Sequence, residues 1–111
     1  MKEKYKMLGL DYDLIASEFP DLNEYETVVS AYFNDPFFLE LREMIEAQDY
    51  EMVKDAAKGL YFLAQDLKLY PLYYALVEIY ADIEEETVND LMKHYEEMLT
   101  VYQKMRGVFC A

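Results

Sequence analysis

The chain contains few of the residue types that usually carry catalysis, and they are scattered. Its 111 residues include one histidine, His94, and one cysteine, Cys110, too few for a zinc site built from several Cys and His ligands. No glycine-rich phosphate loop is present, and Ser17 and Ser30 stand in no nucleophile motif. A carboxylate-bridged dimetal bundle needs Glu three residues before a histidine, but Leu91 holds that position before His94. We therefore expect no enzyme active site, no metal site and no cofactor.

His94 itself has two interpretations. Asp90 lies four residues before it and Glu97 three residues after it, so both carboxylates are its neighbours if the segment is helical. The functional interpretation is a phospho-accepting or ligand-binding histidine. The structural one, which we favour, is a surface histidine beside two acidic residues.

The segment 50–65 is more informative, because its outer face is mixed in character. At 100° per residue, Gly59 lies about 40° from Asp55 and Phe62 about 20° to the other side. A glycine inside a helix costs about 1 kcal/mol relative to alanine, and its physical use is the close approach of a partner's backbone. We predict a docking surface made of six residues. They are Glu51, Asp55, Lys58, Gly59, Phe62 and Asp66. The alternative is a helix buried on both sides, with Phe62 packed under the N-terminal segment.

These residues must be positioned by helices, because apolar side chains recur at three- and four-residue steps along the chain. We predict helices over residues 11–19, 22–34, 36–47, 50–65, 69–81 and 85–106. Asp35-Pro36 is a typical helix opening, and Gly107 is expected to end the last helix. Two apolar stripes define the expected core. One comprises Val53, Ala56, Ala57, Leu60, Leu63 and Ala64, and the other Val88, Leu91, Met92, Tyr95, Leu99 and Tyr102.

Length and composition limit the class of protein. With 54% hydrophobic residues, the chain can bury a core and forms one domain. Its 10 basic and 23 acidic residues give a net charge of −13, which argues against binding nucleic acid or an anionic membrane. No apolar run approaches the roughly 18 residues of a membrane span. The lone cysteine and the lack of a signal peptide favour a cytoplasmic protein.

The expected fold is all-α. Short connections predict an up-down antiparallel arrangement of helices over one domain, residues 1–111. Within it, residues 1–21 form an N-terminal helical extension, residues 22–106 a bundle, and residues 107–111 a tail.

The sequence Asp55-Ala56-Ala57-Lys58-Gly59 resembles the His-x-Leu-Lys-Gly motif of histidine phosphotransfer (HPt) domains. Segment 37–49, the helix expected at 69–79 and the long last helix extend the similarity over residues 22–106. Small stand-alone bacterial HPt proteins are the most similar. The resemblance implies a four-helix bundle with an additional N-terminal helix.

The resemblance fails at the reactive residue. Family members carry a phospho-accepting histidine where this chain has Asp55, while Lys58 and Gly59 are kept. Ala57 replaces the motif leucine, and Gln65 replaces a glycine near the end of the helix. The resemblance therefore implies a non-catalytic module that binds a response-regulator receiver domain or a histidine kinase in a phosphorelay without accepting phosphate. A monomer is expected.

Two other functions remain open. Twelve Tyr and six Phe would also suit a helical interaction or scaffold protein, including a homodimer, that is unrelated to phosphorelay. The third hypothesis is an active phosphotransfer protein that uses His94 or Asp55.

Overall fold

The computed structural model describes residues 2–110, and helices are the only regular elements among them. The all-α prediction is confirmed. The elements, in chain order, are α1 (Lys2–Met7), α2 (Tyr12–Glu18), α3 (Leu22–Phe33), α4 (Phe37–Glu46), α5 (Tyr50–Asp66), α6 (Tyr70–Glu84), the short 3-10 helix η1 (Val88–Asp90) and α7 (Leu91–Phe109).

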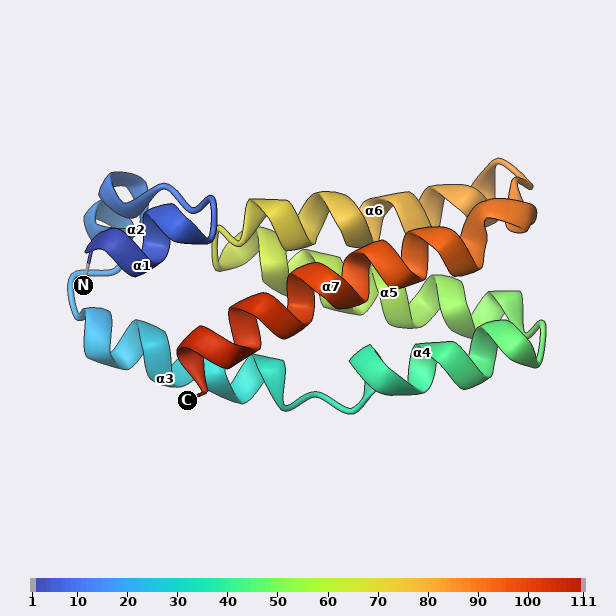
Figure 1. Cartoon of the computed structure of the whole chain (residues 1–111), viewed down its shortest axis with the longest axis horizontal. Helices are drawn as coiled ribbons and strands as arrows, with labels where there is room; N and C mark the ends of the chain where they lie inside the picture. The colour runs from blue at the N-terminus through green and yellow to red at the C-terminus, as the bar shows by residue number, and fades with distance from the viewer. Residues whose placement is uncertain (1, 111) are drawn as a thin grey trace.

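The helices form an elongated body of 41 × 23 × 20 Å. In Figure 1, α5, α6 and α7 run along the long axis, α3 and α4 follow one another along one side, and α1 and α2 lie at one end. From α4 to α7, successive helices run in opposite directions (Figure 1). Helix α6 packs against both α5 and α7, and α4 contacts the same two helices.

Aspartates begin several of the helices. The Asp21 side chain accepts hydrogen bonds from the backbone N–H groups of Asn23 and Glu24, at 3.1 and 3.2 Å, and so caps α3. Asp49 caps α5 through the N–H of Met52 at 3.3 Å. A cap of this kind is worth about 1 kcal/mol because it satisfies donors that have no partner within the helix.

Buried tyrosines tie the helices together by their hydroxyl groups. Each donates to a backbone carbonyl of a different helix or its cap, so the core can hold a polar atom without leaving it unpaired. The bonds are Tyr25 to Leu67 (2.6 Å), Tyr32 to Leu60 (2.6 Å), Tyr95 to Phe38 (2.8 Å) and Tyr102 to Phe33 (3.0 Å). Within residues 2–110, no buried side-chain nitrogen or oxygen lacks a partner.

The N-terminal extension expected over residues 1–21 contains, besides the predicted helix at 11–19, a first helix, α1, that was not predicted as a separate element. Helix α1 places Tyr5 fully inside the molecule, with its ring 5.7 Å from that of Phe109. Lys4 and Tyr5 both donate to the Glu26 carboxylate on α3, the former at 2.7 Å. Contacts with distant segments therefore hold α1 in place.

The prediction that Gly107 ends the last helix is wrong. Gly107 lies inside α7, which continues to Phe109, so residues 107–109 of the expected tail are helical. The reason is packing: the Phe109 ring lies 6.2 Å from Phe33 and 5.7 Å from Tyr5, which favours three further helical residues, 107–109.

The predicted start of the last helix, at residue 85, is also wrong. Helix α6 continues to Glu84, and the chain then turns through Glu86, whose φ is 59°. The backbone N–H of Thr87 donates to the carbonyl of Asp82 at 2.8 Å, which closes this turn. Helix α7 begins only at Leu91, after η1.

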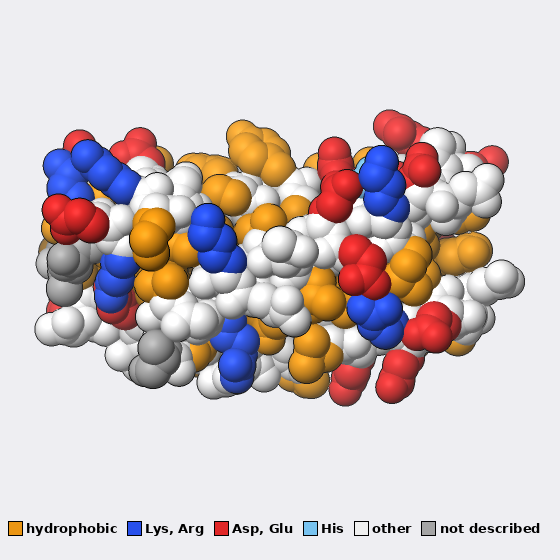
Figure 2. Space-filling view, in the orientation of Figure 1, with side chains coloured by type: hydrophobic (Ala, Val, Ile, Leu, Met, Phe, Trp, Pro, Cys, Tyr) orange, Lys and Arg blue, Asp and Glu red, His pale blue; other side chains and the backbone are white. Residues whose placement is uncertain are grey.

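No helix in the described part of the chain is both long enough and apolar enough to cross a membrane. Figure 2 shows acidic side chains at both ends of one face, with hydrophobic side chains between them.

Candidate functional site

Helix α5 is positioned by the face that it buries. Its buried residues are Val53, Ala56, Ala57, Leu60 and Ala64. The two adjacent alanines allow close packing against the neighbouring helices, and burial of this stripe turns the opposite side of α5 to solvent. Asp55, Gly59 and Phe62 are accordingly exposed.

Asp55 and Gly59 meet in one shallow hollow of about 170 Å³ on the outer face of α5. Phe37, in the first turn of α4, and Leu63, one turn further along α5, line the same hollow. A Cβ atom built on Gly59 would meet nothing within 4 Å. The packing of the chain itself therefore does not require glycine at this position.

Lys58 and Phe62 lie beside this hollow. The Lys58 ammonium group is 5.9 Å from the centre of the Phe62 ring, a cation–π contact at the surface. Phe62 is 49% exposed, so the alternative in which it packs under the N-terminal segment is wrong. The centre of its ring also lies 5.0 Å from that of the neighbouring Tyr61.

The other two predicted residues lie towards the ends of α5. Glu51 is exposed in the first turn. Asp66, the last residue of the helix, lines a second hollow together with Leu63 and Val28. The six predicted residues thus share one helix, but only Asp55 and Gly59 line the central hollow.

Leu63 was expected in the core, and that expectation is wrong. Its side chain is 47% exposed, because it faces the connection between α3 and α4, where residues 34–36 line the neighbouring hollow instead of a covering helix. A weak signal was present: Leu63 lies about 80° from Asp55 on the helical wheel, at the margin of the outer face.

Phe37 and Val28 are surface residues that sequence reasoning missed. Both are large apolar side chains left more than two-fifths exposed, and with Leu63 they border the two adjoining hollows along α5. Phe62 adds a further half-exposed apolar side chain on the same helix. We call Phe37, Asp55, Lys58, Gly59, Phe62 and Leu63 the α5 surface.

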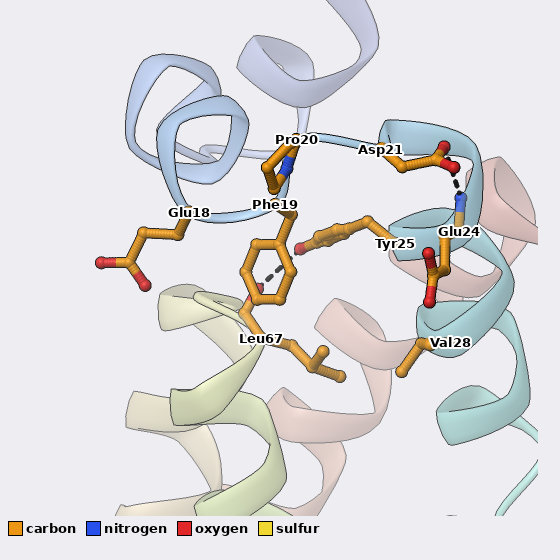
Figure 3. Close-up of a pocket in the computed structure, with 8 residues that line it drawn as sticks. All are labelled: Glu18, Phe19, Pro20, Asp21, Glu24, Tyr25, Val28 and Leu67. Carbon is orange, nitrogen blue, oxygen red and sulfur yellow. Dashed lines mark hydrogen bonds between the residues drawn. The ribbon is translucent and has the colours of Figure 1, made fainter.

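A further hollow lies where α2 and α3 meet the end of α5 (Figure 3). The Phe19 and Tyr25 rings are 4.7 Å apart, and the Tyr25 hydroxyl donates to the Leu67 carbonyl. Asp21 is engaged in capping α3. The Tyr25 hydrogen bond and the Asp21 cap therefore serve the fold at this end of the molecule.

His94 has a partner that its sequence neighbours did not indicate. Its Nδ1 lies 2.6 Å from Oδ2 of Asp82, a buried residue of α6, and its Nε2 lies 3.8 Å from Oε2 of Glu78. The hydrogen bond to Asp82 raises the pKa of His94 above its ordinary value, against the opposing effect of partial burial. The favoured interpretation, a surface histidine beside Asp90 and Glu97, is therefore corrected in part: the hydrogen-bond partner is the buried Asp82, whereas a Glu97 carboxylate oxygen does lie within 4.8 Å of a ring nitrogen.

The α5 surface is better suited to binding another protein than to covalent catalysis. Asp35, the other carboxylate at the central hollow, accepts the N–H of Phe37 at 2.9 Å. Asp55 is exposed and lies beside Gly59, whose Cβ position is free. The residues that line the hollow do not include a histidine. No protein-family model, curated protein or solved structure matches this chain.

Proposed function

We propose that this protein is a non-catalytic docking module, similar to HPt domains, that binds a receiver domain or a histidine kinase through its α5 surface. The observation that carries the proposal is Gly59: an exposed helical glycine with free space at its Cβ position, flanked by Asp55 and by half-exposed apolar side chains. The proposal includes the finer fold, a four-helix bundle in which α3 and α4 share one side and the N-terminal helices are the addition.

Glycine and the apolar side chains have complementary roles in this proposal. Without a Cβ atom, Gly59 lets the backbone of a partner helix come close. Phe37, Phe62 and Leu63 then lose their remaining contact with water. This burial stabilises the complex by roughly 25 cal/mol for each Å² of apolar surface removed from water. Large apolar anchors around a close approach are typical of the centre of a protein interface.

The charges favour a particular kind of partner. The resemblance to HPt domains implies that Asp55 faces the acidic, Mg²⁺-binding pocket of a receiver domain. A carboxylate would be repelled by the empty pocket but can supply an oxygen ligand to the bound metal. Lys58 would face acidic groups at the rim of that pocket. Binding is therefore expected to need Mg²⁺ and to weaken with salt.

Phosphate acceptance is not part of the proposal. Asp55 is an exposed carboxylate on a helix, with no adjacent base to activate it. His94 lies on another helix, and its Nδ1 is engaged by Asp82.

The binding test uses a pair of matched glycine variants. Gly59→Gln fills the free space on α5, and Gly107→Gln fills equally free space near the end of α7. Binding to a panel of receiver and histidine-kinase domains, measured by interferometry with and without Mg²⁺, should fall at least tenfold for Gly59→Gln only. Equal binding by both variants would overturn the proposed surface.

Phosphate transfer is tested separately with a phosphorylated receiver and the full chain. No acid-labile label should appear on the wild-type protein. An acid-labile label lost in His94→Gln would identify an active histidine. A hydroxylamine-sensitive label that persists in His94→Gln and is lost in Asp55→Asn would identify Asp55.

A second candidate function is an aromatic scaffold or homodimer. Tyr61, Tyr70, Tyr73, Tyr74 and Tyr80 form a network of ring contacts over α5 and α6, at 5.3 to 6.4 Å. Tyr74 is 64% exposed. A dimer mass by light scattering that returns to the monomer value in Tyr74→Ser would favour this function over phosphorelay binding.

A further inference from the structure

Helices α6 and α7 bring four chemically active side chains together at a place remote in sequence from the α5 surface. Glu78 and Asp82 lie one turn apart on α6, and His94 and Glu97 lie one turn apart on α7. One ligand atom from each of Glu78, His94 and Glu97 lies within 4.8 Å of the others. Nitrogen and oxygen donors from two helices thus converge on a small volume.

Asp82 determines how the imidazole of His94 is presented. It is only 5% exposed. One of its oxygens accepts the Nδ1 proton of His94 at 2.6 Å, and the other accepts the Thr87 hydroxyl at 3.1 Å. Both oxygens are therefore engaged, and Asp82 fixes the orientation of the ring. Nε2 is left to point towards Glu78, whose Oε2 is 3.8 Å away.

We propose that Glu78, His94 and Glu97 form a binding site for a divalent cation of the zinc type, with Asp82 as the positioning residue. A buried carboxylate that holds Nδ1 while Nε2 binds the metal is a recurrent arrangement at zinc sites. One imidazole nitrogen and two carboxylate oxygens suit Zn²⁺, whereas Mg²⁺ and Ca²⁺ prefer oxygen ligands throughout.

The geometry needs only a small adjustment to accept the ion. Zn²⁺ bonds of about 2.0 to 2.2 Å in a tetrahedron place ligand atoms about 3.4 Å apart. The present separations, all within 4.8 Å, exceed this by no more than about 1.4 Å, and the Glu78 side chain is 58% exposed and so free to move. With three protein ligands, the fourth position is left for water or another group.

A local motif could not reveal this site. The expectation of no metal rested on the single histidine and cysteine, and on the absence of Glu three residues before His94. Here the carboxylate on α7 follows the histidine by three residues, and the other ligand comes from α6 across the turn formed by residues 85–90. Only the pairing of the two helices brings these groups together.

The test exploits the fact that His94 is the sole histidine in the chain. In a ¹H–¹⁵N imidazole spectrum of the whole protein at fixed pH, one equivalent of Zn²⁺ should move the Nε2 resonance while Nδ1 keeps its proton. Mg²⁺ at the same concentration should have no effect. If the imidazole signals do not respond to Zn²⁺, the proposal is overturned.

Calorimetric Zn²⁺ titrations of variants assign the ligands. His94→Gln should abolish one-to-one binding, and Glu78→Gln and Glu97→Gln should each weaken it at least tenfold. Glu40→Gln, which neutralises an exposed carboxylate on α4, is the matched control and should bind as the wild type does. Unchanged affinity in His94→Gln would show that Zn²⁺ is held only by the acidic surface.

Asp82→Asn tests the positioning role. Loss of a carboxylate that orients a ligating histidine costs about 10–100-fold in metal affinity, and the proton on the free imidazole should then redistribute between Nδ1 and Nε2 in the ¹⁵N spectrum. An Asp82→Asn protein with wild-type affinity and an unchanged Nδ1 signal would contradict that role. If this variant does not fold, Glu78→Gln and Glu97→Gln still decide the site. The α5 surface plays no part in these measurements, so its binding function stands or falls separately.

Discussion

The hydroxyl of Tyr95 on α7 donates a hydrogen bond of 2.8 Å to the backbone carbonyl of Phe38 in the first turn of α4. The two residues are 57 positions apart, and both are fully buried. This bond ties the first turn of α4 to α7, next to the exposed Phe37 of the α5 surface.

Replacing Tyr95 by Phe should therefore lower the free energy of unfolding. A buried hydrogen bond contributes about 0.5–1.5 kcal/mol, and the loss should fall in that range in urea unfolding monitored by circular dichroism. Tyr74→Phe removes a hydroxyl from an exposed ring and should change stability by less than about 0.5 kcal/mol. Equal effects of the two substitutions would contradict the role given to the Tyr95 hydroxyl.

Gly59→Ala should stabilise the protein by about 1 kcal/mol, because alanine favours the helix and the added methyl group meets no neighbour. Gly107→Ala should give a similar gain in a thermal unfolding experiment. A loss of stability at Gly59 would mean that its Cβ position is not free. If Gly59→Ala is more stable but binds its partner more weakly, Gly59 contributes to partner binding and not to folding.

Gln48→Gly should also stabilise the protein, for a different reason. Gln48 has φ of 57° in the turn after α4, and this left-handed conformation costs about 1 kcal/mol for a residue with a Cβ atom. The greater flexibility of unfolded glycine offsets part of the gain, so about 0.5 kcal/mol is expected in urea. Gln103→Gly, within α7, provides the opposite control and should cost about 1 kcal/mol.

Acid should loosen the attachment of α1 through Glu26. Partial burial raises the pKa of Glu26, but hydrogen bonds from Lys4 and Tyr5 lower it by more, so the pKa lies below its ordinary value of 4.5. A lowered pKa in the folded state gives stability that is present above the ordinary pKa and is lost as the pH falls through the folded one.

The measurement is the free energy of unfolding from pH 7 down to acid, for the wild type and for Glu26→Gln. The variant should be less stable at neutral pH and should lose less stability below about pH 4.5. Parallel curves for the two proteins would show that Glu26 does not contribute to the acid dependence.

Much of the fold could be predicted from local signals. Asp21 and Asp49 mark helix starts because their carboxylates cap backbone N–H groups a few residues away. The start of α7 could not be predicted, because it depends on the left-handed Glu86 and on the bond from Thr87 to Asp82. The three glutamates at 84–86 favour a helix N-terminus in isolation, but the structure places the end of α6 there.

The candidate site divides in the same way. Asp55, Gly59 and Phe62 could be placed on one exposed face by helical periodicity alone. Exposure of Leu63 and Phe37 depends on how residues 34–36 pass beside α5, which is a property of tertiary packing.

The tyrosines whose hydroxyl groups join the helices are also intrinsic optical probes. The chain has twelve tyrosines and no tryptophan, so near-ultraviolet absorption and emission come almost entirely from phenol rings. Burial raises the pKa of Tyr5, Tyr25 and Tyr32 well above the ordinary value. In an alkaline titration, the exposed rings should form phenolate first and reversibly. The buried rings should ionise only as the helices separate, so that the late phase of the phenolate spectrum reports unfolding without any added label.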